Sequence, residues 1–150
     1  MKLVLSEEQQ FLKDTAKNFA AERTPVNHFR SLRDNADPVL WDKDIWQEMV
    51  ALGWTGILIP EEYGGQGYGY VELIVVLEEM GRSLLCAPYF SSVVLAANTL
   101  IHSGDDNAKS ELLPRIAEGT IATLAITEEN GKWDESGVTM QATASGDGYI

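Results

Sequence analysis

The sequence predicts a mainly α fold, an up-and-down helical bundle followed by the first strands of a β domain. Several stretches before Gly119 carry apolar residues at helical spacing. Four glycines between residues 64 and 69 interrupt them, as expected of a connector between helices. After Gly119, short runs of β-branched residues separated by turn signals replace the helical pattern. We therefore expect a helical domain over residues 1–119 and the beginning of a β-sheet domain over residues 120–150.

Composition narrows the classes of partner. The 150 residues are 45 % hydrophobic and 23 % charged, which is typical of a soluble globular protein. The net charge of −12 makes nucleic acid and anionic membrane improbable partners. The single cysteine, Cys86, excludes an internal disulfide and is expected to be a small buried hydrophobe rather than a nucleophile. The amino terminus resembles neither a signal nor a transit peptide, so we expect a cytoplasmic protein.

The first half of the helical domain contains two expected helices. Residues 6–9 fit a capping box, so the first helix begins at Ser6, and it ends before Pro25. Residues 25–38 lack periodicity and predict a loop with at most a short helical turn. A second helix leads into the glycine cluster. The apolar stripes of these two helices consist of Leu5, Leu12, Ala16 and Phe19, and of Trp41, Ile45, Met49 and Leu52.

The glycine cluster is the stretch around which the chain is organised. Gly53 is placed to cap the second helix. At least one of Gly64, Gly65 and Gly67 should have a positive φ, since glycine adopts it at low cost. A phosphate-binding loop is an alternative interpretation. It is less favoured, because no predicted strand precedes the cluster and no Lys-Ser/Thr pair ends it.

Three further helices are expected. The runs at 71–80 and 90–101 are apolar nearly all round and predict buried helices, more buried than the helix over residues 6–20. Asp105 or Asp106 should cap the last helix, Pro114 should kink or restart it, and Gly119 should end it. The pair Glu78 and Glu79 is not expected to be catalytic. Adjacent side chains on a helix diverge, so these carboxylates are interpreted as helix-end charges near Arg82.

The last thirty residues predict strands. Residues 121–127 are expected to form a buried strand, 138–144 a second, and 149–150 the start of a third, with turns at 128–137 and 145–148. A strand only two residues long cannot complete its ladder, so we expect the sequence to be a truncated part of a longer protein.

The stretch 53–84 resembles a known family. Its elements G-W, I-P-E-E-Y-G-G-x-G and E-E-M-G-R-S-L are similar in order and spacing to the amino-terminal helical domain of acyl-CoA dehydrogenases. The resemblance covers all 150 residues. It implies the N-terminal part of an FAD-dependent oxidoreductase that performs α,β-dehydrogenation of an acyl-CoA thioester. It also implies an electron-accepting flavoprotein as partner and a homo-oligomer when the protein is full length.

The resemblance implies where the flavin would lie. The strand end at 124–128, Leu-Ala-Ile-Thr-Glu, matches the family's flavin-contacting strand, with Leu124 in place of an aromatic residue. Leu124, Ile126 and Thr127 are therefore candidate FAD contacts. The following turn departs from the family pattern by placing Trp133 where a serine is common. Trp133 would stack on the flavin or thioester, or would cover the sheet; both interpretations stay open.

The resemblance also implies an acyl-binding surface and no catalytic residue on this chain. Pro88, Ser91 and Leu95 are candidate substrate contacts, and core packing is an equally good interpretation of them. The family's catalytic base is a glutamate in a carboxy-terminal helical domain, with no counterpart in this sequence. No metal site is expected, because neither His28 nor His102 has ligand-like spacing around it.

Two alternatives to the dehydrogenase remain. Flavin oxidases, nitroalkane oxidases and flavin monooxygenases share the scaffold with different chemistry. A non-catalytic helical interaction module is the alternative from another class. Acyl chain length and electron acceptor cannot be read from the sequence.

Overall fold

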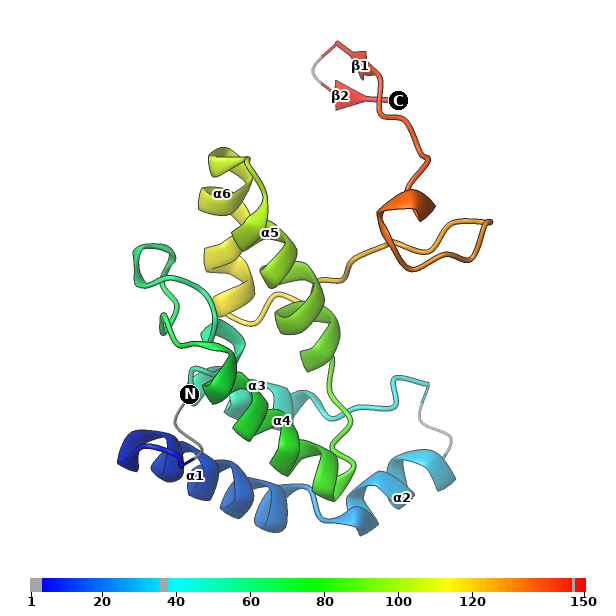
Figure 1. The fold of residues 1–150 in the computed structure, drawn as a ribbon. Coiled ribbons are helices and arrows are strands. Elements are labelled where there is room, and N and C mark those ends of the chain that lie inside the picture. The colour runs from blue at the N-terminus through cyan, green and yellow to red at the C-terminus, as the bar shows by residue number, and fades with distance from the viewer. Residues whose placement is uncertain (1–3, 36–37, 147) are drawn as a thin grey trace.

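The computed structural model describes residues 4–35, 38–146 and 148–150, and it is mainly helical (Figure 1). The longer helices are α1 (Glu7–Arg23), α2 (Val26–Asp34), α3 (Lys43–Ala51), α4 (Tyr70–Ser83) and α6 (Asp106–Ala117). A π-helical stretch, η3 (Phe90–Ala97), continues directly into α5 (Asn98–His102). Three 3₁₀ turns are η1 (Trp54–Gly56), η2 (Glu61–Tyr63) and η4 (Glu135–Gly137), and a hairpin pairs β1 (Ala144–Ser145) with β2 (Gly148–Tyr149). The predicted fold class is confirmed.

Local signals determine several helix ends. The Ser6 hydroxyl accepts from the Gln9 amide while the Gln9 side chain accepts from the Ser6 amide, which confirms the capping box. Asp105 caps α6 through the amides of Asn107 and Ala108. Gly53 follows α3 with a φ of +74°, as expected of a glycine at this position. These ends follow from residues within four positions of each other, which is why the sequence shows them.

The core lies where α1, α3, α4 and η3 meet, and a smaller cluster lies between the η3–α5 helix and α6. In Figure 1, α1 runs beneath α4. Met49 and Val76 are fully buried at the centre of the larger cluster, and Leu113 is fully buried in the smaller one. The rings of Phe19 and Trp54 meet edge-on with centroids 5.1 Å apart, joining α1 to η1. The helices therefore share a continuous packed interior.

The structure corrects the prediction for residues 25–38. Most of them form α2 rather than a loop, and residues 36 and 37 lie outside the described part. Pro25 precedes the helix with φ −59°, a value already compatible with helix entry. Phe29 and Leu32, three residues apart, are half-buried on one side. The stripe is too short to stand out among polar neighbours.

The two helices expected to be buried all round are buried on one side only. α4 buries Leu73, Val76 and Met80, but Val71 is 47 % and Ile74 59 % exposed. Phe90, at the start of η3, is 58 % exposed. The predicted ranking is nevertheless confirmed, because α1 buries only Ala16 and Ala20. The other apolar faces of α4 and η3 are exposed in this chain.

α6 corrects one part of the expectation for Pro114, that the helix would restart there, and the kink stays a prediction. The helix runs without restarting from Asp106 to Ala117, with Pro114 inside its last turn. The amide of Glu118 still reaches the Pro114 carbonyl at 3.0 Å. Gly119 then turns the chain with φ +97°, as predicted. A Cβ at Gly119 would lie 2.6 Å from Val50 Cγ2, so glycine also permits the close approach to α3.

The strand predictions are largely wrong for this chain. Residues 121–127 are extended but form no strand, and of 138–144 only Ala144 belongs to one. β-branched residues favour a sheet, but a strand forms only where a neighbouring strand pairs with its backbone. The third predicted strand is confirmed at Tyr149, and Asp147 of its predicted turn lies outside the described residues. Figure 1 shows the hairpin standing apart from the helices at the end of an extended stretch.

Candidate functional site

The glycine cluster forms a closed loop. Gly64 and Gly67 have φ of +81° and +63°, which confirms the predicted left-handed conformation. Gly65 is needed for another reason, since a Cβ there would lie 2.0 Å from the Ile59 carbonyl oxygen. The loop thus folds back directly onto the apolar strip at 57–59.

The backbone of this loop has no amide left for a phosphate. The amides of 64–68 donate to carbonyls at Glu61, Pro60, Gly56, Ile59 and Ile57, at 2.9–3.2 Å. The Gly69 amide donates to the Glu72 carboxylate at 3.0 Å, which also occupies the amino end of α4. A phosphate cradle requires free amides and tolerates no carboxylate there. The alternative of a phosphate-binding loop is therefore wrong, and the structural connector is confirmed.

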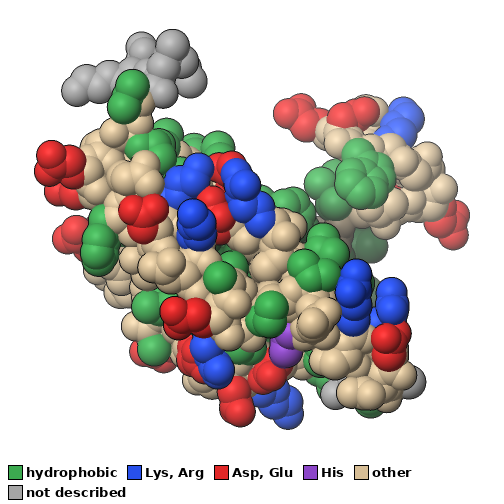
Figure 2. Space-filling view, turned by 90° about the horizontal axis from the view of Figure 1, so that it is seen from below, with side chains coloured by type: hydrophobic (Ala, Val, Ile, Leu, Met, Phe, Trp, Pro, Cys, Tyr) green, Lys and Arg blue, Asp and Glu red, His purple; other side chains and the backbone are tan. Residues whose placement is uncertain are grey.

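The carboxylates Glu78 and Glu79 belong to an ion-pair network. Arg82 lies 2.6 Å from Glu78 and 3.4 Å from Glu79, and Lys13 of α1 lies 3.0 Å from Glu78. The hydrogen bond from Arg82, with Lys13 adding to it, holds the pKa of Glu78 below its ordinary range. Figure 2 views the underside of the molecule, where acidic and basic side chains are interleaved. These residues join α1 to α4, consistent with the sequence interpretation as helix-end charges.

The candidate acyl-contacting residues gather at the start of η3. Pro88, Ser91 and Leu95 are all half-buried, and the Ser91 hydroxyl donates to the Pro88 carbonyl at 3.0 Å. None of the three is fully enclosed in the core. Their role as substrate contacts stays a prediction.

The candidate flavin-contacting residues lie on the extended segment 121–127. Leu124 lines an apolar cavity of about 300 Å³ together with residues of α5 and α6, among them Leu100, Leu112 and Ile116. Among the described residues, none forms a hydrogen bond with the backbone of residues 123–127. The amides and carbonyls around Ile126 and Thr127 are thus open to an external partner.

The loop after this segment is closed by one carboxylate. Glu128 accepts from the amides of Thr139 and Met140, each at 2.9 Å, and from the Thr139 hydroxyl. The bond from the Thr139 hydroxyl, followed by the Met140 amide, lowers the pKa of Glu128. Trp133, near the tip of this loop, is 81 % exposed. Both interpretations of Trp133, stacking on the flavin or thioester and covering the sheet, stay predictions.

Four hydrogen bonds that the sequence analysis missed attach the end of α6 and the residues after it to α3, η1 and η3. Trp46 Nε1 donates to the Gly119 carbonyl at 2.8 Å, and Thr55 Oγ1 donates to the Ala117 carbonyl. Ser92 bonds to Ala122 through both the amide, at 3.0 Å, and the carbonyl, at 3.2 Å. A serine in an otherwise apolar helix is the one available signal, because a buried hydroxyl needs a partner.

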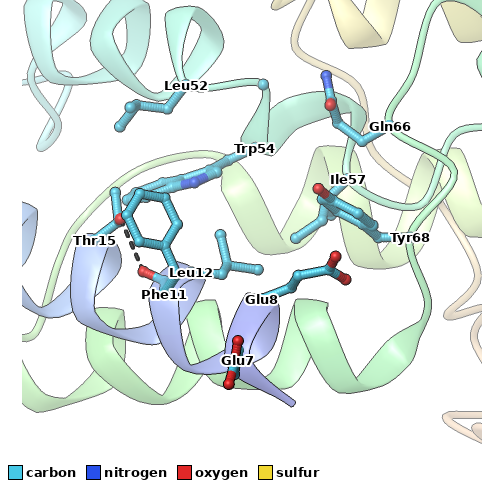
Figure 3. A pocket seen from close by; sticks show the side chains of 11 residues that line it. Glu7, Glu8, Phe11, Leu12, Thr15, Leu52, Trp54, Ile57, Gln66 and Tyr68 are labelled. Atoms are coloured by element: carbon cyan, nitrogen blue, oxygen red, sulfur yellow. Dashed lines mark hydrogen bonds between the residues drawn. The ribbon is translucent and has the colours of Figure 1, made fainter. Parts of the chain in front are cut away.

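A larger cavity lies at the other side of the helical part (Figure 3). It measures about 570 Å³ and lies between α1, the end of α3 and the glycine loop. Phe11 and Leu12 of α1 face Trp54, with Ile57 and Tyr68 across from them. The exposed residues Glu7 and Glu8, at the start of α1, also line it. Phe11 is 75 % exposed, and it is absent from the apolar stripe that predicted α1, so the sequence analysis missed this surface.

Two expected absences can be described only in part. Among residues 4–35, 38–146 and 148–150, no helix is long and apolar enough to cross a bilayer. The same residues contain no group of His, Cys, Asp and Glu able to hold a metal ion. Cys86 is half-buried rather than buried.

Comparisons with known proteins agree with this geometry. The family profile "Acyl-CoA dehydrogenase, N-terminal domain" matches residues 6–120. Mitochondrial isovaleryl-CoA dehydrogenase of Pongo abelii is 32 % identical over 97 % of this chain. The chain spans only 35 % of that relative's length.

Solved structures give the same result. A chain of the ChsE4–ChsE5 complex from Mycobacterium tuberculosis superposes with a TM-score of 0.80 at 28 % identity, covering 99 % of this chain and 39 % of that one. A chain in the structure of the electron transferring flavoprotein of Acidaminococcus fermentans superposes at 0.76 with 29 % identity, covering 100 % and 39 %.

Proposed function

Because this chain belongs to the acyl-CoA dehydrogenase family, we propose that it is the N-terminal part of an FAD-dependent enzyme. The enzyme removes hydrogen from the α and β carbons of an acyl-CoA thioester. Bound FAD supplies the hydride acceptor for this chemistry. We assign no catalytic base to the described residues, since Glu78 and Glu79 are held in ion pairs.

The open backbone of residues 123–127 is the observation that carries the proposal. The polar edge of a flavin ring needs several hydrogen-bonding partners, and exposed backbone groups beside a hydroxyl provide them. The hydroxyl of Thr127 has no partner among the described residues and lies at the end of this segment. Leu124 and Ile126 supply apolar contact, and Trp133 stacks on the ring or thioester. These residues suit the flavin ring of FAD and not its pyrophosphate, because the chain's net charge of −12 repels a phosphate group.

The acyl group lies against the start of η3. Pro88, Ser91 and Leu95 offer a half-buried, mostly apolar surface there. The exposed side chain of Phe90, the first residue of η3, extends that apolar surface. Gly119 marks the boundary between the helical domain, 1–119, and the β domain that begins at 120.

The partner is an electron-accepting flavoprotein, and the cavity of Figure 3 is the surface we assign to it. The cavity combines an exposed phenylalanine and a tryptophan with two exposed carboxylates in its lining, Glu7 and Glu8. Neither carboxylate forms an ion pair among the described residues. An apolar side chain flanked by basic residues is the complementary partner surface. We further propose a cytoplasmic homo-oligomer.

The test compares two proteins: the 150 residues and the full-length protein that carries them. FAD titrated by flavin fluorescence should bind the full-length protein tightly and the 150 residues weakly or not at all. Addition of an acyl-CoA without oxygen should bleach the bound flavin. A full-length protein that binds no FAD would overturn the flavoenzyme and favour the non-catalytic helical module.

Oxygen separates the remaining chemistries. A dehydrogenase should transfer electrons to a flavoprotein acceptor and react slowly with O₂, whereas an oxidase should release H₂O₂ at the rate of substrate consumption. Phe11→Ser should raise the KM for the acceptor flavoprotein at least about fivefold, since a truncated aromatic anchor costs more than ~1 kcal/mol. Bleaching by acyl-CoA should be unchanged. An unchanged KM would contradict the assignment of the cavity.

A further inference from the structure

Ser92 connects the two surfaces that the proposed function uses. It lies on η3, directly after Ser91 and three residues before Leu95, and its side chain is fully buried. Its hydroxyl oxygen accepts from the Ala122 amide at 3.0 Å, and the hydroxyl donates to the Ala122 carbonyl at 3.2 Å. One side chain thus bonds both polar backbone groups of a residue thirty positions away.

These two bonds are the main polar restraint on the segment. Among the described residues, nothing else hydrogen-bonds the backbone of Ile121, Ala122 or residues 123–127. The Thr120 amide is the last one bonded back to α6, at the Arg115 carbonyl. A residue bonded through both amide and carbonyl is fixed in position and rotation, as in an antiparallel bridge pair. Ser92 therefore replaces the strand neighbour that this segment lacks.

We infer that Ser92 is a positioning residue that sets the flavin-binding segment relative to the acyl-binding surface of η3. The inference rests on the proposed function for the identity of the two ligands. Thr127 follows Ala122 by five residues of extended chain, about 17 Å at the usual rise. Among the described residues, Ala122 is the last hydrogen-bonded residue before Thr127, so the orientation of its peptide sets the direction in which the segment leaves η3. Ser91 and Leu95 share the helix that holds Ser92, so the two ligand surfaces move together.

The test compares Ser92→Ala with Ser83→Ala in the full-length protein. Ser83 is the matched control: its buried hydroxyl lies 3.2 Å from the Met80 carbonyl and 3.3 Å from the Thr24 hydroxyl, far from Ala122. Both variants lose one buried hydroxyl, so both should lower Tm by a similar amount. Only Ser92→Ala should accelerate exchange of the Ala122 amide in the flavin-free protein, because that amide loses its acceptor. Only Ser92→Ala should lower kcat, by at least about tenfold, with a smaller change in the KM for acyl-CoA.

Exchange and kinetics answer separate questions. Unchanged exchange of the Ala122 amide in Ser92→Ala would overturn the positioning role even in a protein that binds FAD. If the full-length protein binds no FAD but Ser92→Ala still accelerates exchange of the Ala122 amide, the proposed function would be overturned and the positioning role supported. Equal loss of kcat in both serine variants would mean that the effect is general destabilisation, and would overturn the inference.

Discussion

Two irregular stretches of this chain have opposite uses for their backbone. In the glycine loop, every amide from 64 to 69 donates to an acceptor inside the protein. In the segment 121–127, only Ala122 is hydrogen-bonded among the described residues. Absence of regular secondary structure therefore does not identify a binding surface. A stretch that has satisfied its own polar groups serves as scaffold, and one that has not is available to a partner.

Amide exchange should show the largest difference between the two stretches. In the 150-residue chain, the amides of 64–68 should exchange at least about 10³-fold more slowly than those of 123–127, because the loop opens only with the helical core. Mass spectrometry of peptides covering each stretch measures this directly. Equal protection of the two stretches would contradict the conclusion that the backbone of 123–127 is free of hydrogen bonds within the described residues.

In the full-length protein, FAD should slow amide exchange in the segment 123–127 and not in the glycine loop. With FAD bound, exchange at 123–127 should slow by about 10²-fold, since a ligand that binds only the folded site stabilises it in proportion to its saturation. Exchange at 64–68 should change little. Protection of the glycine loop instead of the segment would place the ligand elsewhere.

Substitutions in the glycine loop should separate steric from conformational demands. Gly65→Ala should lower the free energy of unfolding by more than ~2 kcal/mol, because its Cβ would collide with the Ile59 carbonyl oxygen. Gly64→Ala meets nothing within 4 Å and should cost only the ~1 kcal/mol of a left-handed alanine. Gly104→Ala, with open space and no positive φ, is the control and should be nearly neutral. Urea denaturation gives all three values, and a Gly104 variant as unstable as Gly65→Ala would contradict this ranking.

Low pH should destabilise the glycine loop by less than the substitution of Gly65 does. The hydrogen bond from Gln9, ahead of the backbone amides at the amino end of α4, lowers the pKa of Glu72. A carboxyl whose pKa is depressed by folding contributes stability above its unfolded value, about 4.3, and loses it as pH falls through the folded value. Tm should therefore decline below about pH 4.3. Glu72→Gln should show a shallower decline, and identical profiles would exclude Glu72 as a contributor.

What the sequence could predict depends on how far apart the interacting residues are. The capping box at Ser6, the turn at Gly53 and the cap at Asp105 each involve neighbours in the chain, and all three were predicted correctly. α2 was missed because Phe29 and Leu32 are too few to establish a period. The strand at 121–127 was predicted from side-chain preference, whereas pairing is decided by a neighbouring strand.

The site shows the same limit more strongly. The candidate residues Leu124, Ile126, Thr127, Pro88, Ser91 and Leu95 came from resemblance to a family and not from spacing. The bonds of Ser92 to Ala122 join residues thirty positions apart, and no local pattern indicates them. The cavity around Phe11 and Trp54 likewise brings together α1 and the end of α3.

The π-helical winding of η3 has a consequence for comparing relatives. Hydrogen bonds that close at i+5 instead of i+4 place more residues in each turn than an α-helix does. Over the eight residues from Phe90 to Ala97, the side chains therefore fall progressively behind the α-helical register. A relative with an α-helix here presents different residues to the same surface, although an ungapped alignment would equate them. A structural superposition of the two helices should therefore precede any transfer of substrate preference from such a relative.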